Sequence, residues 1–184
     1  MPERGVDFLM KNWYALFIKT GYESFVEQNI RRLFRSAEIF PFVPRAERIV
    51  KLPGMVKKEM QNMFPGYLFI DTDIEGVEFN FMISRAKPFM QELIRVVRYS
   101  ATFDILIAPE ERNLLDILLN DERCLEASKG FIENDRVYVT EGPLIGRESI
   151  IRKIDRHKRK AIIEMDILGA MRQVTVALEI VEKI

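Results

Sequence analysis

The hydrophobic pattern of the chain changes once, after Asn120, and this change limits the folds that are available. Before Asn120, apolar strands alternate with amphipathic helices, as in mixed α and β domains. After it, a polar stretch leads into short alternating strands separated by tight turns, which favours a small barrel. We therefore predict an α+β chain with a first domain at 1–120, a linker at 121–130 and a small β-barrel domain at 131–184.

The apolar periodicity predicts the individual elements. In the first domain, strands are expected at 12–18, 39–50, 67–70 and 93–97. The segment 39–50 contains two prolines and so belongs at a sheet edge, and 51–62 is predicted to be a loop or hairpin tip. Helices are expected at 22–35, from Ile74 to near Pro88, and from Pro109 onward. In the second domain, strands are expected at 136–140, 150–154, 161–167 and 174–180.

The composition excludes several classes of function. Cys124 is the single cysteine and His157 the single histidine, which rules out a disulfide framework and a metal site built from these residues. No long apolar run occurs and the first residues are charged, so we expect no membrane span and a cytoplasmic location. Residues 142–146 lack the ending of a phosphate loop, and no catalytic triad is available. The sequence therefore predicts a protein that is not an enzyme and has no cofactor.

Charge is balanced over the chain and concentrated in one place. The 28 Lys and Arg equal the 28 Asp and Glu, but residues 147–160 hold seven Lys and Arg against two acids, a net +5. The densest part, 156–160, is the tip of a predicted hairpin, where a phosphate backbone would relieve the repulsion between like charges. From charge alone, a solvated polar turn is an equally good interpretation. The candidate nucleic-acid-binding residues are Arg147, Arg152, Lys153, Arg156, His157, Lys158, Arg159 and Lys160.

Aromatic side chains surround the two most apolar strands of the first domain. Phe17 and Phe69 alternate with inward-facing neighbours, so they could point to the opposite face of the sheet. Such a face is either covered by helices or exposed as a docking patch. Composition alone favours the core over docking.

Two motifs resemble the NusG family. Trp13-Tyr14 opens a strand, a helix begins just after Gly21, and Phe64-Pro65-Gly66-Tyr67-Leu68-Phe69 follows, as in the N-terminal domain of that family. Asp135-Arg136-Val137-Tyr138-Val139, followed by Glu141-Gly142-Pro143-Leu144 and Gly146, is similar to the KOW motif of its C-terminal domain. The resemblance implies an N-terminal antiparallel sheet with flanking helices, the NGN type, and a C-terminal SH3-like KOW barrel.

The resemblance also implies a function. Members of the family are elongation factors that ride on RNA polymerase as monomers, gripping the clamp helices of the largest catalytic subunit with an aromatic pocket. Carried over by motif, the polymerase-binding residues would be Tyr14, Phe17, Phe64, Tyr67 and Phe69.

The basic run at 151–161 is similar to that of the specialised LoaP paralogues, which are antiterminators. For that group, the resemblance implies a KOW domain that contacts an RNA hairpin in the nascent leader. We therefore predict a processive antitermination and elongation factor. The alternative is a general NusG-like factor whose KOW domain binds a ribosomal protein or a termination factor.

Non-template DNA is a further possible partner, because another paralogue of the family reads it through a basic helix. Here the matching helix starts with Glu23 and Glu27, which disfavours DNA reading. Arg31, Arg32 and Arg35 leave a non-specific contact open.

Overall fold

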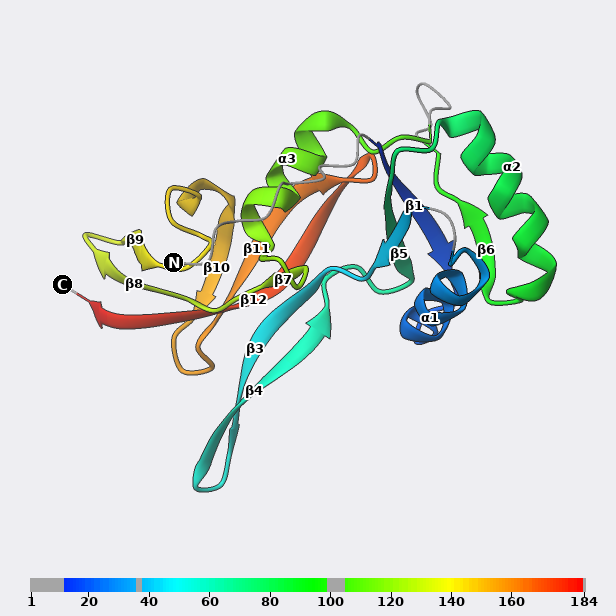
Figure 1. Ribbon diagram of the computed structural model, residues 1–184. Helices are drawn as coiled ribbons and strands as arrows, with labels where there is room; N and C mark the ends of the chain where they lie inside the picture. The colour runs from blue at the N-terminus through cyan, green and yellow to red at the C-terminus, as the bar shows by residue number, and fades with distance from the viewer. Residues whose placement is uncertain (1–11, 36–37, 99–104, 184) are drawn as a thin grey trace, which may run out of the picture. The chain divides into compact units, whose positions relative to one another are not determined.

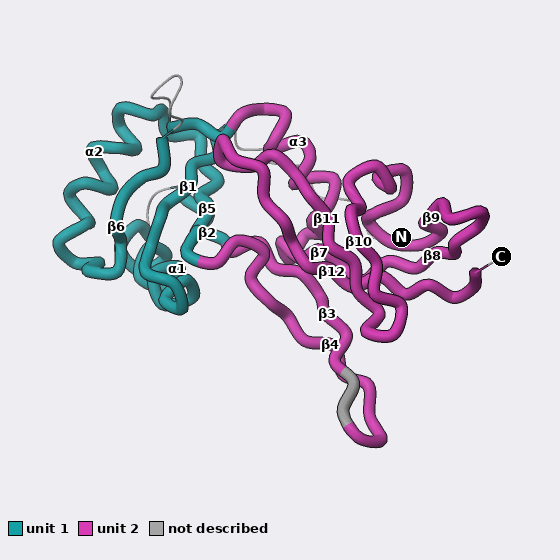
Figure 2. The backbone as a smooth tube through the Cα atoms, turned by 180° about the vertical axis from the view of Figure 1, so that it is seen from behind, with its two compact units in different colours: residues 1–42, 66–107 teal, residues 43–65, 108–184 magenta. Residues whose placement is uncertain are grey.

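The protein consists of two compact units, which Figure 2 distinguishes by colour. The computed structural model describes residues 12–35, 38–98 and 105–183, so the charged N-terminal segment lies outside the described residues. The first unit comprises residues 1–42 and 66–107, and the second comprises 43–65 and 108–184. The chain therefore crosses between the units three times.

The first unit is built on an antiparallel sheet in the order β2-β5-β1-β6 (Figure 1). Its strands are β1 (Asn12–Ile18), β2 (Ile39–Phe42), β5 (Tyr67–Thr72) and β6 (Leu93–Val96). Its helices are α1 (Glu23–Leu33), α2 (Gly76–Ala86) and the short 3-10 helix η1 (Lys87–Phe89). The expected strand at 12–18 is confirmed, and Pro41 lies on the edge strand β2, where a missing N–H costs nothing.

Aromatic packing holds the first unit together around β1. The Tyr14 ring stacks on Phe79 of α2 with 3.9 Å between centroids, and its hydroxyl donates to the Ile74 carbonyl at 2.8 Å. Trp13 meets Phe42 edge-on at 4.9 Å. Because aromatic rings bury large areas in such arrangements, β1 is buried along almost its whole length.

The second unit contains a five-stranded sheet in the order β10-β11-β12-β8-β9. Its strands are β8 (Ser128–Glu133), β9 (Arg136–Glu141), β10 (Ile151–Asp155), β11 (Lys160–Ile167) and β12 (Ala170–Lys183), with a 3-10 turn η2 (Glu148–Ile150) before β10. The long strand β12 pairs antiparallel with β11 through residues 170–177 and parallel with β8 through residues 178–183. One strand thus serves both halves of the sheet, as in small curled β domains. The α+β fold class predicted from the sequence is confirmed.

A second, three-stranded sheet in this unit has the order β4-β3-β7, where β3 is Arg45–Leu52, β4 is Met55–Asn62 and β7 is Cys124–Leu125. The prediction of a loop or hairpin tip at 51–62 was therefore largely wrong, because β4 pairs with β3 along its whole length and only Pro53-Gly54 turn. The strand signal was missed because most side chains of β4 are exposed and its apolar and polar residues do not alternate.

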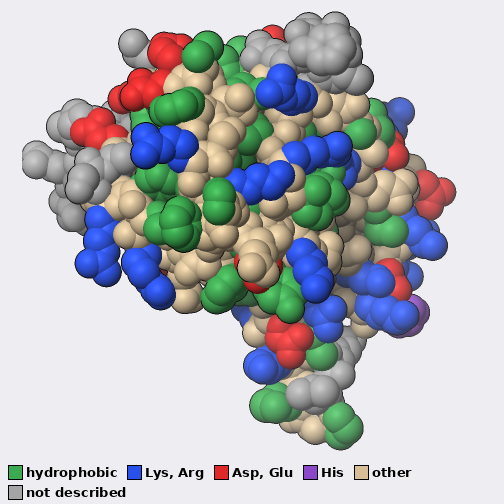
Figure 3. Space-filling view, turned by 90° about the vertical axis from the view of Figure 1, so that its right-hand side faces the viewer, with side chains coloured by type: hydrophobic (Ala, Val, Ile, Leu, Met, Phe, Trp, Pro, Cys, Tyr) green, Lys and Arg blue, Asp and Glu red, His purple; other side chains and the backbone are tan. Residues whose placement is uncertain are grey.

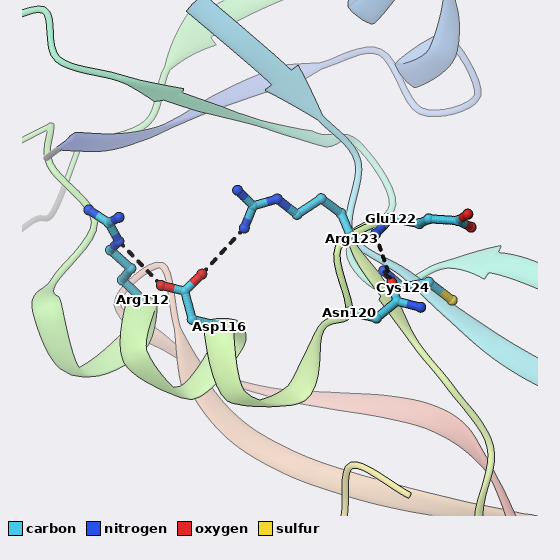
Figure 4. Close-up of polar contacts among 6 residues, drawn as sticks. All are labelled: Arg112, Asp116, Asn120, Glu122, Arg123 and Cys124. Atoms are coloured by element: carbon cyan, nitrogen blue, oxygen red, sulfur yellow. Dashed lines mark hydrogen bonds and ion pairs between the residues drawn. The ribbon is translucent and has the colours of Figure 1, made fainter. Parts of the chain in front are cut away.

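The segment expected to be a linker is also ordered. The side-chain oxygen of Asn120 accepts the backbone N–H groups of Glu122 and Cys124, both at 3.0 Å (Figure 4). Asp116, near the end of α3 (Pro109–Leu118), lies between Arg112 at 3.4 Å and Arg123 at 3.3 Å. These contacts bend the chain directly from α3 into β7. Residues 121–130 thus hold β7 and the start of β8.

Hydrogen bonds across long sequence distances explain why 43–65 and 108–120 group with the C-terminal residues. The Glu47 carboxylate accepts the Ala127 N–H at 2.8 Å, and Gln61 Nε2 donates to the Thr175 carbonyl at 2.6 Å. Buried Glu111 of α3 accepts the Leu168 N–H at 3.0 Å. The boundaries of the two units, at residues 42, 65 and 107, therefore differ from the domain boundaries at 120 and 131 that the sequence pattern indicates.

Candidate nucleic-acid interface and aromatic surface

The basic run forms the turn between β10 and β11, which we call the basic loop (residues 156–159). The Asp155 carboxylate accepts the Lys158 N–H at 3.0 Å and closes the turn. This hydrogen bond, with the positive charges of Lys158 and Lys160, keeps the pKa of Asp155 below its usual value. The carboxylate therefore stays ionised and fixes the backbone from which the cations project. Figure 3 shows Lys and Arg side chains gathered beside the histidine.

The eight predicted nucleic-acid-binding residues differ in how far their charge is already neutralised. Arg152 pairs with Glu164 at 2.8 Å, and Arg159 pairs with Glu179 at 3.1 Å. The half-buried Arg147 has a buried Nε without a hydrogen-bond partner in the described part of the chain. Within residues 12–35, 38–98 and 105–183, no acid lies within ion-pair distance of the remaining five, which are Lys153, Arg156, His157, Lys158 and Lys160.

The polymerase-binding residues predicted by motif are mostly buried. Tyr14 and Phe69 are fully buried and Phe64 is only 3% exposed. The Phe69 ring packs against Trp13 and Phe42, with centroids 6.5 and 5.6 Å away, which agrees with the core alternative that composition alone favours. Such side chains shape a surface from beneath.

Phe17 and Tyr67 are the two members of that set that reach the surface. Both are half-buried, and their ring centroids lie 5.3 Å apart. The Arg95 guanidinium lies 5.4 Å from the Phe17 centroid, within the range of a cation–π interaction. The three side chains form a small surface of two aromatic rings and one cation.

Glu23 positions this surface, although its sequence position indicated only a favourable charge at a helix start. Its side chain is 3% exposed and accepts the N–H groups of Gly21 at 2.9 Å and Gly66 at 2.7 Å. Gly66 has φ +83°, and a Cβ there would lie 3.3 Å from the Phe17 ring. Glu23 thus holds the Phe-Pro-Gly turn against β1. No local sequence signal distinguishes this role from that of an exposed helix-start acid.

An apolar groove between α1 and α2 also escaped the sequence analysis. Its volume is about 370 Å³, and it is lined by Leu33, Phe34, Phe81, Met82 and Phe89 together with Glu78 and Arg85. Phe81 and Phe89 are 63% and 75% exposed. A signal was available in Phe81, which helical periodicity places away from the buried Phe79 and Ile83, whereas Phe89 follows in η1.

Cys124 lies in β7, where its thiol is buried and its Sγ is 3.3 Å from Met60 Sδ. Burial, together with the charges of Glu47 and Glu126, raises the pKa of the thiol. Among the described residues, no group of His, Cys, Asp or Glu side chains could hold a metal ion. None of the helices in the described ranges is long and apolar enough to cross a membrane.

Glu47 links the β3–β4 hairpin to the C-terminal sheet, and its titration gives a testable pH dependence. Burial tends to raise the pKa of this carboxyl, but the hydrogen bonds from Lys58 and Ala127 outweigh it, so the pKa lies below the ordinary 4.5. A lowered pKa means that the stabilisation is complete above about pH 4.5 and is lost as the pH falls through the folded-state pKa.

We expect Glu47→Gln to lose about 1 kcal/mol of stability at pH 7 and to show a shallower loss of stability as the pH falls below about 5. Urea denaturation at several pH values measures both quantities. Glu59→Gln is the control, since the ion pairs of Glu59 with Arg48 and Lys57 are longer, at 3.5 and 3.6 Å. Parallel pH curves for wild type and Glu47→Gln would contradict the assignment.

Comparison with known proteins identifies the family. The family model described as "Transcription termination factor nusG" matches residues 11–103. The "Transcription termination/antitermination protein NusG" of Staphylococcus carnosus is 23% identical over 179 residues, covering 95% of this chain and 96% of that protein. The protein of the same name from Thermus thermophilus is 25% identical over 169 residues, covering 85% and 90%. The solved structure "Domain interaction in Thermotoga maritima NusG" has a TM-score of 0.48 and 18% identity, and covers 92% and 93% of the two chains. Because the family model matches just over half of the 184 residues, the chain belongs to the NusG family.

Proposed function

We propose that the protein is a processive antitermination and elongation factor of the LoaP type, which docks on RNA polymerase and contacts a hairpin in the nascent leader RNA. The observation that carries this proposal is the set of cations on the basic loop that have no acidic partner in the described ranges. The names of the relatives, transcription termination/antitermination proteins, support an action on transcription. Such a factor works in the cytoplasm as a monomer.

The polymerase contact belongs to the first unit in this proposal. Phe17 and Tyr67 offer aromatic area beside Arg95, which suits the clamp helices of the largest catalytic subunit. The buried Tyr14, Phe64 and Phe69 support the adjoining backbone. An RNA contact and a polymerase contact on one chain raise the effective concentration of each other, so two weak interactions suffice for stable recruitment.

Contact with non-template DNA has less support. The Arg31 guanidinium donates to Glu27 at 3.0 Å and to the Pro41 carbonyl at 2.6 Å, so it is already engaged. Any such contact falls to Arg32 and Arg35, which are exposed and lie at the end of α1. Two neighbouring cations provide a non-specific contact and no sequence reading.

Transcription through a terminator by purified RNA polymerase tests the proposed function. We expect the protein to raise read-through at least about fivefold when the template encodes the leader hairpin, and to have little effect when the hairpin is deleted. A variant with glutamine at Arg156, Lys158 and Lys160 should lose the increase in read-through that the hairpin confers.

Read-through that is independent of the leader would contradict the proposal. It would favour the alternative, a general NusG-like factor whose C-terminal domain binds a ribosomal protein or a termination factor.

An acidic protein surface could bind the same basic loop. Binding of the protein to ribosomal or termination proteins, compared with its binding to leader RNA, therefore distinguishes the two functions.

A further inference from the structure

A groove lies beside the basic loop, wholly within the second unit. One wall comes from the β3–β4 hairpin and the other from the basic loop with β11 and β12. The lining includes Arg48, Val50, Gln61, Lys158, Lys160 and Thr175. Its volume is about 440 Å³, which lies in the lower part of the range of small-ligand sites and is too small for a helical RNA stem.

Hydrogen bonds fix the two walls relative to each other. Gln61 Nε2 donates to the Thr175 carbonyl at 2.6 Å across the groove. Glu47 of the same hairpin accepts the Ala127 N–H at 2.8 Å. Within the hairpin, the Glu47 carboxylate also accepts Lys58 Nζ at 2.9 Å. Because the bonds to Thr175 and Ala127 join the hairpin to the rest of the unit, the groove exists before any ligand binds, which lowers the entropic cost of binding.

The groove combines positive charge with an apolar side. In the described ranges, Lys158 and Lys160 have no acid within ion-pair distance, and Arg48 pairs only weakly with Glu59, at 3.5 Å on an exposed surface. Val50 and Ile49 are half-buried and supply apolar area. Gln61 and Thr175 add side chains that can form hydrogen bonds. This chemistry suits a ligand with an anionic part and a flat, polar-edged ring.

We propose that this groove binds one unpaired nucleotide of the RNA, with its phosphate against Lys158 and Lys160 and its base against Val50; the inference rests on the proposed RNA contact and deepens it. The major groove of an RNA stem is too deep and narrow to be read, so proteins recognise RNA sequence mainly at unpaired bases. An acidic protein segment would satisfy the cations but would leave the apolar wall unfilled. The β3–β4 hairpin thereby becomes part of the RNA site.

Two synthetic stem-loop RNAs test the inference with the full-length protein. One carries a single bulged 2-aminopurine, and the other has the same stem fully paired. We expect the bulged RNA to bind about tenfold more tightly at the same salt concentration, with a change in 2-aminopurine fluorescence. Arg48→Gln should reduce this preference to about twofold while leaving the affinity for the paired stem within about twofold.

Lys57→Gln is the matched control. Lys57 and Arg48 lie on the same hairpin and pair with the same acid, Glu59, but Lys57 does not line the groove. We expect Lys57→Gln to keep the wild-type preference for the bulge. Equal losses in the two variants, or displacement of the bulged RNA by polyglutamate at equal charge concentration, would overturn the inference.

The same experiment separates this inference from the function on which it rests. Equal binding of the two RNAs, with loss of both in the variant lacking Arg156, Lys158 and Lys160, would overturn the groove and support the RNA contact of the basic loop. Absence of binding to either RNA would overturn both.

Discussion

Glutamine at Arg156, Lys158 and Lys160 together should weaken binding of a leader RNA hairpin by about 100-fold near physiological salt. None of the three side chains has an acid within ion-pair distance in the described part of the chain, so each can pair with a phosphate at no loss of an internal ion pair. Each phosphate contact releases counterions, so the slope of log affinity against log salt should become shallower by about 2 to 3. Filter binding or gel-shift titrations at four salt concentrations measure both effects.

A double variant of the neutralised arginines, Arg152→Gln with Arg159→Gln, is the control for this prediction. These side chains already pair with Glu164 and Glu179, so they have less to offer a phosphate. We expect a loss of only about threefold and a nearly unchanged salt slope. A double variant as weak as the triple variant would show that total charge, and not the free cations of the basic loop, sets the affinity.

Glu23→Ala should lower the free energy of unfolding by about 3 kcal/mol. The substitution leaves the N–H groups of Gly21 and Gly66 without their charged acceptor, and the Gly66 hydrogen bond is buried. Removal of one partner from a buried hydrogen bond costs more than the bond itself contributes, because the remaining donor stays desolvated. Urea denaturation followed by tryptophan fluorescence measures the change, since Trp13 is the single tryptophan and lies in the same unit.

Glu78→Ala provides the comparison for Glu23. Both acids lie in the first turn of a helix, but Glu78 is exposed, so its loss should cost no more than about 0.5 kcal/mol. The polymerase contact should also weaken in Glu23→Ala, because the turn beside Phe17 loses its anchor. Equal destabilisation in the two variants would mean that Glu23 acts only through the helix dipole.

Local periodicity was sufficient for most of the individual elements. The strand at 12–18 is β1, Pro109 opens α3 as its position predicted, and the hairpin around residues 156–159 joins β10 to β11. These features depend on neighbours two to four residues away, which the sequence displays directly. The motif 141–144 likewise marks a turn in which Gly142 has φ +93° and a Cβ would lie 2.7 Å from Ser128 Oγ.

Local sequence patterns could not predict contacts between residues that lie far apart in the sequence. The charge pattern located the basic run at 151–161 but could not show that Glu164 and Glu179, on other strands, neutralise two of its cations. The motif resemblance named aromatic residues without showing that Phe69 packs inside the sheet. The buried acid Glu23 was missed for the same reason, since its hydrogen bond to Gly66 joins segments 43 residues apart.

The bond between Gln61 and Thr175 has a consequence for the order of events during synthesis. The two residues are 114 positions apart, and Glu47 and Ala127, which are also hydrogen-bonded, are 80 positions apart. Contacts of such long sequence separation form late, because a large loop must close first. The β3–β4 hairpin therefore leaves the ribosome well before the strand that completes its groove. The groove is therefore complete only after Thr175 has been synthesised, and the RNA binding that we propose for it begins no earlier.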